Sequence, residues 1–187
     1  MGIFEYAASI LSIVLGLAVA HLLGGVAWII RAPKTGPIFW VFSSWCFVML
    51  LVIIGWWWGI WATFKDLEEL SFWDFLPPFV VSTLLYVASR ILVPDLTTMS
   101  SDVRAHFFEI NTPFFVCLAL VFVVSSAIVV VESGPGTLVS WEGLLGALLA
   151  LLALGGAATR RPQIHATLVP IWTVLYLWQQ GIQPGLG

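Results

Sequence analysis

Charged residues are scarce in this chain. Only 9% of its 187 residues are Asp, Glu, Lys or Arg, whereas 60% are hydrophobic. A soluble domain has about 25% charged residues, so this composition excludes an ordinary water-soluble fold and predicts an integral membrane protein. The few Lys and Arg residues form no dense basic cluster, which excludes a nucleic acid as partner.

The chain also lacks the short motifs of common enzymes. It contains no Gly-rich phosphate loop and no H-E-x-x-H, C-x-x-C or G-x-S-x-G sequence. Hydrolase, dithiol and nucleotide-driven chemistry therefore have no support, and neither does a c-type haem. Retinal requires a lysine deep in a membrane helix, but Lys34 and Lys65 both lie between apolar runs. We predict no catalytic residue, and an enzyme is the less favoured interpretation.

Six long apolar runs divide the sequence, each of about the 20 residues that a helix needs to cross a bilayer. The gaps between them are short, and Pro and Gly residues mark several of them as turns. We therefore predict an all-α integral membrane protein, a single transmembrane domain over residues 1–187, with six helices arranged as three antiparallel hairpins. The predicted helices span about 4–30, 38–63, 75–93, 107–131, 138–158 and 163–181.

The few charges alternate between the gaps and predict the orientation. Six of the seven Lys and Arg residues lie in three gaps, namely Arg31 with Lys34, Arg90 with Arg104, and Arg160 with Arg161. Lys65 lies in another gap, among acidic residues. Basic loops face the cytoplasm, so we expect both termini on the non-cytoplasmic side of a plasma or inner membrane.

Polar side chains inside membrane helices are the candidate site residues, because lipid makes them costly to expose. All three histidines and Arg90 fall near the predicted cytoplasmic ends of their helices, and Tyr86 precedes Arg90 by one helical turn. We take His21, His106, His165, Arg90 and Tyr86 as candidates for binding an apolar cofactor such as haem, quinone or pigment. Hydrogen-bonded structural histidines are the more favoured interpretation.

A metal site is not predicted. His106 and Glu109 are three residues apart on one helical face, as in carboxylate-bridged metal sites of helix bundles. Such sites repeat the motif on several helices, whereas this chain contains it once.

The remaining signals favour contact with other proteins in the membrane. The chain has 11 tryptophans, most of them near the predicted outer helix ends, and small residues recur at steps of three and four along residues 5–24 and 143–157. Small-residue faces let membrane helices pack closely. We therefore expect a non-enzymatic accessory or scaffolding subunit that contacts lipid and other membrane subunits. A small-solute transporter or channel and a cofactor-binding membrane protein are the alternatives.

Overall fold

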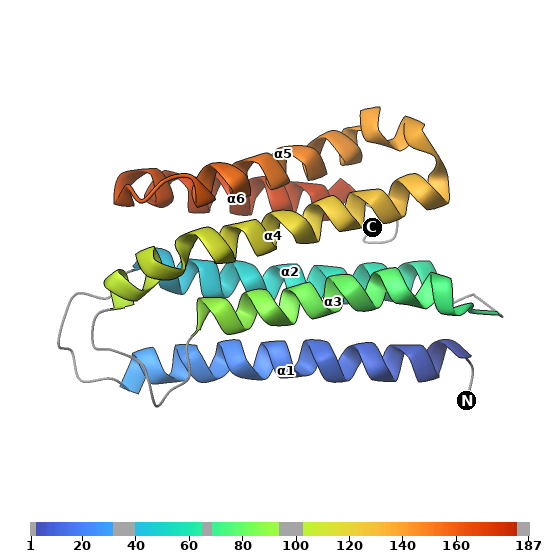
Figure 1. Ribbon diagram of the computed structural model, residues 1–187, viewed down its shortest axis with the longest axis horizontal. Helices are drawn as coiled ribbons and strands as arrows, with labels where there is room; N and C mark the ends of the chain where they lie inside the picture. The colour runs from blue at the N-terminus through green and yellow to red at the C-terminus, as the bar shows by residue number, and fades with distance from the viewer. Residues whose placement is uncertain (1–2, 32–39, 65–68, 94–102, 183–187) are drawn as a thin grey trace.

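The structure is a computed structural model that describes residues 3–31, 40–64, 69–93 and 103–182, and these residues form helices joined by short turns. The predicted all-helical fold class is confirmed. The elements are α1 (Ile3–Arg31), α2 (Trp40–Phe64), α3 (Phe72–Leu92), α4 (Val103–Ser133), the short 3-10 helix η1 (Pro135–Val139), α5 (Trp141–Ala157) and α6 (Pro162–Ile182). Successive long helices reverse direction along one common axis (Figure 1).

Four of these helices, α1 to α4, are long and apolar enough to cross a membrane. The fifth, α5, is apolar but has only 17 residues. The sixth, α6, has 21 residues and is less apolar on average than α1 to α5. The chain therefore has the helices of a multi-pass membrane protein.

Local capping explains where two of the helices begin. At α3, the Ser71 hydroxyl accepts a hydrogen bond from Asp74 N, and the Asp74 carboxylate accepts one from Ser71 N, which starts the helix at Phe72 rather than at residue 75. At α5, Ser140 accepts from Gly143 N, so this helix begins at Trp141. The predicted helix at 138–158 therefore divides into the end of η1 and α5. The predicted start at residue 38 lies outside the described residues, as do the loop charges Lys34, Lys65, Asp66 and Glu68.

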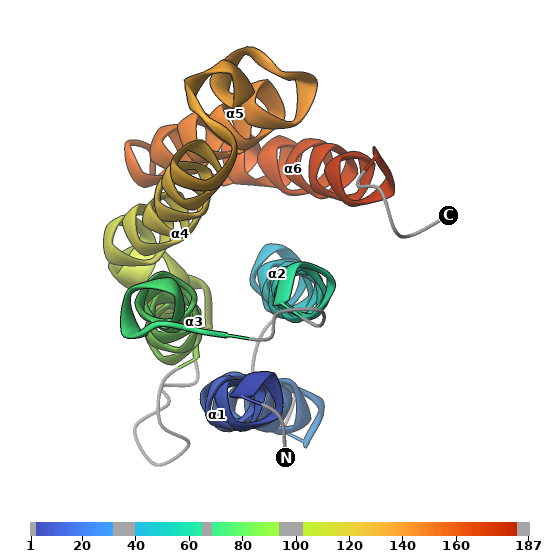
Figure 2. The ribbon, with the colours of Figure 1, turned by 90° about the vertical axis from the view of Figure 1, so that its right-hand side faces the viewer.

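Viewed along the helices, α1 lies at one edge of the bundle and α5 at the other (Figure 2). Between them, α3 and α2 pack against α1, α4 packs against both α3 and α5, and α6 packs against α5 and α2. Residues on α4 can therefore contact the ends of both α3 and α5.

Large aromatic side chains fill the space between α2, α4 and α6. The Trp45 ring lies 4.8 Å from Phe115 and 5.8 Å from Trp172, measured between ring centroids, and all three side chains are fully buried. Edge-to-face contacts of this kind add to the stabilisation from burial. The aromatic core continues along α6, where Tyr176 stacks on Trp172.

Most of the exposed tryptophans belong to the ends of α2 and α6 and the starts of α3 and α5, whereas Trp40 is at the start of α2. Those four helix ends lie at one end of the bundle (Figure 1). Trp73 and Trp141 are 74% and 60% exposed, and Trp178 is 59% exposed. Such rings are typical of a membrane–water interface, because they combine an apolar body with a polar N–H group.

Candidate functional site

The candidate histidines lie at the end of the bundle opposite the exposed indole rings, where α3 and α5 end. The last four carbonyl groups of an α-helix have no partner within the helix, so other donors must satisfy them. Inside lipid, an unsatisfied carbonyl costs several kcal/mol because no water is available. The roles of the histidines follow from which donors bond the last carbonyl groups of α3 and α5.

At the end of α3, two histidines from neighbouring helices donate to the terminal carbonyls. Nε2 of His21 on α1 lies 2.5 Å from the oxygen of Val93, and Nε2 of His106 on α4 lies 3.2 Å from the oxygen of Leu92. A carbonyl can only accept, so both Nε2 atoms have a hydrogen. His21 and His106 therefore connect α1 and α4 to the end of α3.

Arg90 determines which ring nitrogen of His21 accepts a hydrogen bond. Its Nη1 atom lies 3.1 Å from Nδ1 of His21, and a guanidinium can only donate, so Nδ1 presents its lone pair. In His21, Nδ1 is thus the acceptor and Nε2 the donor. Both nitrogens are occupied, by Arg90 and by Val93, which leaves no lone pair for a haem iron or a metal ion.

Gly25 allows this contact between α1 and α3. A Cβ atom at Gly25 would lie 2.4 Å from Cγ1 of Val93, closer than any side chain tolerates. The glycine is one helical turn after His21 and therefore lies on the same face of α1. The two residues act together, because Gly25 lets α1 approach and His21 supplies the hydrogen bond.

Tyr86 does not join this group. It is half-buried and packs against the apolar core of the bundle. Within the described residues, no hydrogen bond links its hydroxyl to the histidines or to Arg90. Of the five candidates, the structure brings together His21, Arg90 and His106, and places Tyr86 and His165 elsewhere.

The end of α5 is closed by a second set of donors. Nδ2 of Asn111 on α4 lies 2.9 Å from the oxygens of both Gly156 and Thr159, and the Thr112 hydroxyl donates to Ala157 O. Nε2 of His165 on α6 lies 3.0 Å from the same Thr159 oxygen. Asn111 and His165 are fully buried. Sequence analysis did not select Asn111 as a site residue, although a buried amide in an apolar helix is a signal for such a contact.

Three phenyl rings enclose His165. Phe115 stacks on the imidazole with centroids 5.3 Å apart, and Phe107 and Phe108 meet it edge-on. Because Nε2 donates to Thr159, the ring has its lone pair at Nδ1, and this atom has no hydrogen-bond partner among the residues that the structure describes. Oδ1 of Asn111 has none among them either. Within the described part of the chain, the end of α5 therefore contains two buried acceptors without a donor.

Metal binding has little support in this arrangement. Within the described parts of the chain, no three His, Cys, Asp or Glu side chains lie close enough to share a metal ion. The exposed Glu109 is on the same helix face as His106, but the imidazole of His106 donates to Leu92.

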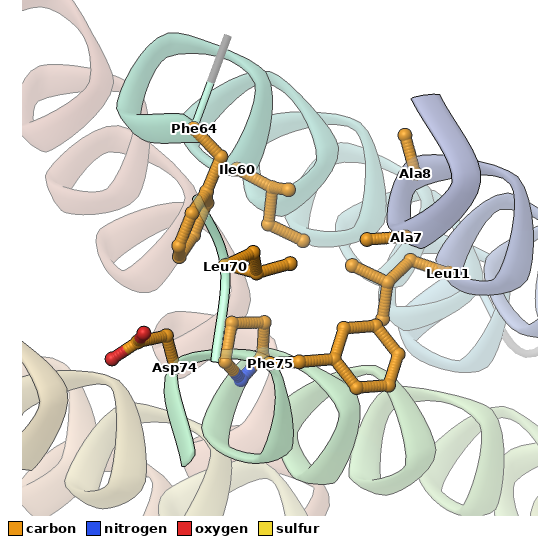
Figure 3. A pocket seen from close by; sticks show the side chains of 9 residues that line it. Ala7, Ala8, Leu11, Ile60, Phe64, Leu70, Asp74 and Phe75 are labelled. Carbon is orange, nitrogen blue, oxygen red and sulfur yellow. The ribbon is translucent and has the colours of Figure 1, made fainter. Parts of the chain in front are cut away.

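A small apolar pocket lies at the opposite end of the bundle, between α1, α2 and α3 (Figure 3). Ala7, Leu11, Ile60 and Phe75 line it, and its volume is about 10 Å³, which is room for about one water molecule. Asp74 is at its rim, but this carboxylate binds Ser71. The pocket is a packing space and offers no ligand site.

α4 therefore supplies hydrogen-bond donors to the ends of two other helices. His106 on α4 binds the end of α3, and Asn111 and Thr112, further along the same helix, bind the end of α5. Comparison of the chain with protein-family models, with curated proteins and with solved structures finds no match.

Proposed function

We propose that this chain is a non-enzymatic scaffolding subunit of a larger membrane protein complex. The observation that supports it most is the use of the histidines. Each of the three donates Nε2–H to a backbone carbonyl at or beyond the end of a helix, two at α3 and one just after α5. The three histidines, the side chains best suited to bind a ligand or transfer a proton, thus hold helices together, which is what a rigid packing subunit requires.

The filled interior supports packing over passage of a solute. Trp45, Phe115 and Trp172 occupy the space between α2, α4 and α6 and are fully buried. A channel or transporter needs a polar route near the middle of the bilayer. An interior of interlocked indole and phenyl rings favours a rigid body.

The proposed topology has six membrane-spanning helices with both termini on the non-cytoplasmic side of a plasma membrane. With 31 residues, α4 is longer than a bilayer requires, and the shorter α5 packs beside it. Exposed Arg160 and Arg161 lie at the same end of the bundle as Arg90 and Arg104, together with one acid, Glu109, whereas Asp74, Glu132 and Glu142 lie at the other end. This segregation is the pattern that the positive-inside rule associates with cytoplasmic and external ends.

Cysteine labelling tests the topology. In a chain whose Cys46 and Cys117 are replaced by Ala, Glu69→Cys and Gly136→Cys should react with a membrane-impermeant maleimide added to intact cells. Arg160→Cys should react only after permeabilisation. Labelling of Arg160→Cys in intact cells, with protection of the other two, would reverse the orientation.

Purification tests the scaffolding role. The tagged chain, at native expression level in mild detergent, should elute with specific protein partners at a mass well above its own 20.6 kDa. An absorption spectrum of the same preparation tests the cofactor alternative, since haem, chlorin or carotenoid would give a visible band. A chain that elutes alone and moves solute into liposomes contradicts the proposal.

A further inference from the structure

An open groove runs along the surface between α2 and α6. It encloses about 570 Å³, within the range of about 300 to 1,000 Å³ that small-molecule sites have. Both helices begin at the same end of the bundle (Figure 1), so they run in the same direction. The groove extends inward from Trp40, the first residue of α2. In a membrane, a groove of this size must be filled by something.

The walls of the groove suit a hydrocarbon chain. Phe47 and Val48 of α2 face Val169 and Val174 of α6 across it, and Phe47 and Val174 are 58% and 64% exposed. Pro170, which interrupts the hydrogen-bond ladder of α6, also lines it.

Two hydroxyl groups lie near the end of the groove where α2 begins. Ser43 and Ser44 line it and are half-buried, and no hydrogen bond joins their hydroxyls to any other described residue. By contrast, the hydroxyl of Thr173, deeper in the groove, donates to Val169 O of its own helix. The serines are thus donors placed just inside the bundle end, next to an apolar channel.

Positive charge lies at the same end of the bundle. Arg160 and Arg161 are exposed in the turn between α5 and α6, and no described acidic side chain pairs with either guanidinium. The two arginines do not themselves line the groove, but along the bundle axis the order from this end inward is cationic groups, hydroxyl donors and apolar walls. This order matches the phosphate, ester carbonyls and acyl chain of a phospholipid.

We propose that the groove between α2 and α6 binds one anionic phospholipid, with its acyl chain along Phe47 and Val174, its ester carbonyls at Ser43 and Ser44, and its phosphate near Arg160 and Arg161. The site requires that α6 lie in the membrane, as in the proposed topology. It does not depend on the scaffolding role, which the co-purification experiment tests separately.

Lipid titrations of the full, delipidated chain, followed by native mass spectrometry, test the site. The probes are phosphatidylglycerol and the zwitterionic phosphatidylcholine with the same acyl chains. Each basic residue near an anionic surface contributes about a fivefold gain in binding, so Arg160→Gln with Arg161→Gln should weaken phosphatidylglycerol binding about thirtyfold and leave phosphatidylcholine nearly unchanged. Arg104→Gln, at the same end of the bundle on α4, is the control and should leave the preference in place.

The apolar part of the site has a closely matched pair of variants. Val174→Phe narrows the groove and should weaken binding of both lipids at least fivefold. Val123→Phe makes the same change on the exposed face of α4 outside the groove and should have no effect. Unfolding temperatures of both variants would show whether either change disturbs the fold.

Three outcomes would overturn the inference: equal binding of the two lipids, equal effects of Val174→Phe and Val123→Phe, or loss of the preference in Arg104→Gln alone. If Val174→Phe released a co-purifying protein and left lipid binding intact, the groove would be a protein interface.

Discussion

The two helix ends that α4 contacts differ in how deeply their donors are buried. At the end of α3, His21 and His106 are half-buried and Arg90 is exposed. At the end of α5, Asn111 and His165 are both 0% exposed. Water or lipid headgroups can replace a donor lost at the α3 end, whereas the buried Asn111 and His165 leave the α5 end only the protein donors that remain there. Hydrogen bonds of the same kind should therefore stabilise the protein more where they are buried.

The two helix ends also differ in whether their polar side-chain atoms have hydrogen-bond partners. Both nitrogens of His21 have partners, Arg90 and Val93. At the α5 end, by contrast, His165 Nδ1 and Asn111 Oδ1 have no partner in the described ranges of the chain. The buried end thus gains strong hydrogen bonds but also retains two costly acceptors.

The largest effect is expected at Gly156, where α5 approaches α4 and α6. A Cβ there would lie 2.9 Å from Phe115 Cδ1 and 3.0 Å from Leu168 Cδ2, and the Phe115 ring is held between Trp45 and His165. Gly156→Ala should lower the free energy of unfolding by about 2 to 3 kcal/mol through overpacking. Denaturation in micelles measures this.

Gly155→Ala is the control for that change, since a Cβ at Gly155 meets nothing within 4 Å. It should be neutral or should stabilise the helix by up to about 1 kcal/mol. Equal behaviour of the two variants would show that the end of α5 is loosely packed.

Asn111→Leu should have the next largest effect. It removes the donor shared by Gly156 O and Thr159 O, while it also removes the unpaired Oδ1 acceptor. We expect a loss of about 2 kcal/mol in the free energy of unfolding. Thr112→Val removes one exposed hydrogen bond of 3.2 Å at the same helix end and should cost under about 1 kcal/mol.

His21→Ala tests the more exposed end. It should cost about 1 kcal/mol, because headgroups or water can reach Val93 O in place of the imidazole. ¹⁵N NMR of the unmodified chain should show Nδ1 of His21 as a hydrogen-bond acceptor and Nε2 as a donor. A loss as large as that of Asn111→Leu would contradict the distinction between the two ends.

Tyr86→Phe should have the smallest effect, within about 0.5 kcal/mol, because the hydroxyl has no hydrogen-bond partner among the described residues. A change above about 1 kcal/mol in thermal unfolding would show that Tyr86 takes part in a polar contact after all.

Much of the helical layout was predictable. Apolar runs located the helices, and the differences arose at their ends, where the pairing of Ser71 with Asp74 and of Ser140 with Gly143 decides the first residue. These caps are local and readable in principle, since both follow the spacing of a helix N-terminus.

The sequence favours a hydrogen-bonded structural role for the histidines, but their partners were not predictable, because these are backbone atoms. His21 binds the carbonyl of Val93, 72 residues away, and His106 binds that of Leu92, 14 residues away. Every residue has a carbonyl, so no side-chain pattern marks these two. The acceptors of Asn111 were not predictable for the same reason, since they are the carbonyls of Gly156 and Thr159.

By itself, the sequence determined an apolar, all-helical chain with its cations gathered near one set of helix ends, because hydrophobic length and charge are local properties. Only the tertiary structure decided which helix ends those polar residues close. Neither the partners of His21 and Asn111 nor the groove between α2 and α6 exists until distant helices pack, since a helix end gains its missing hydrogen bonds only from whatever lies beside it.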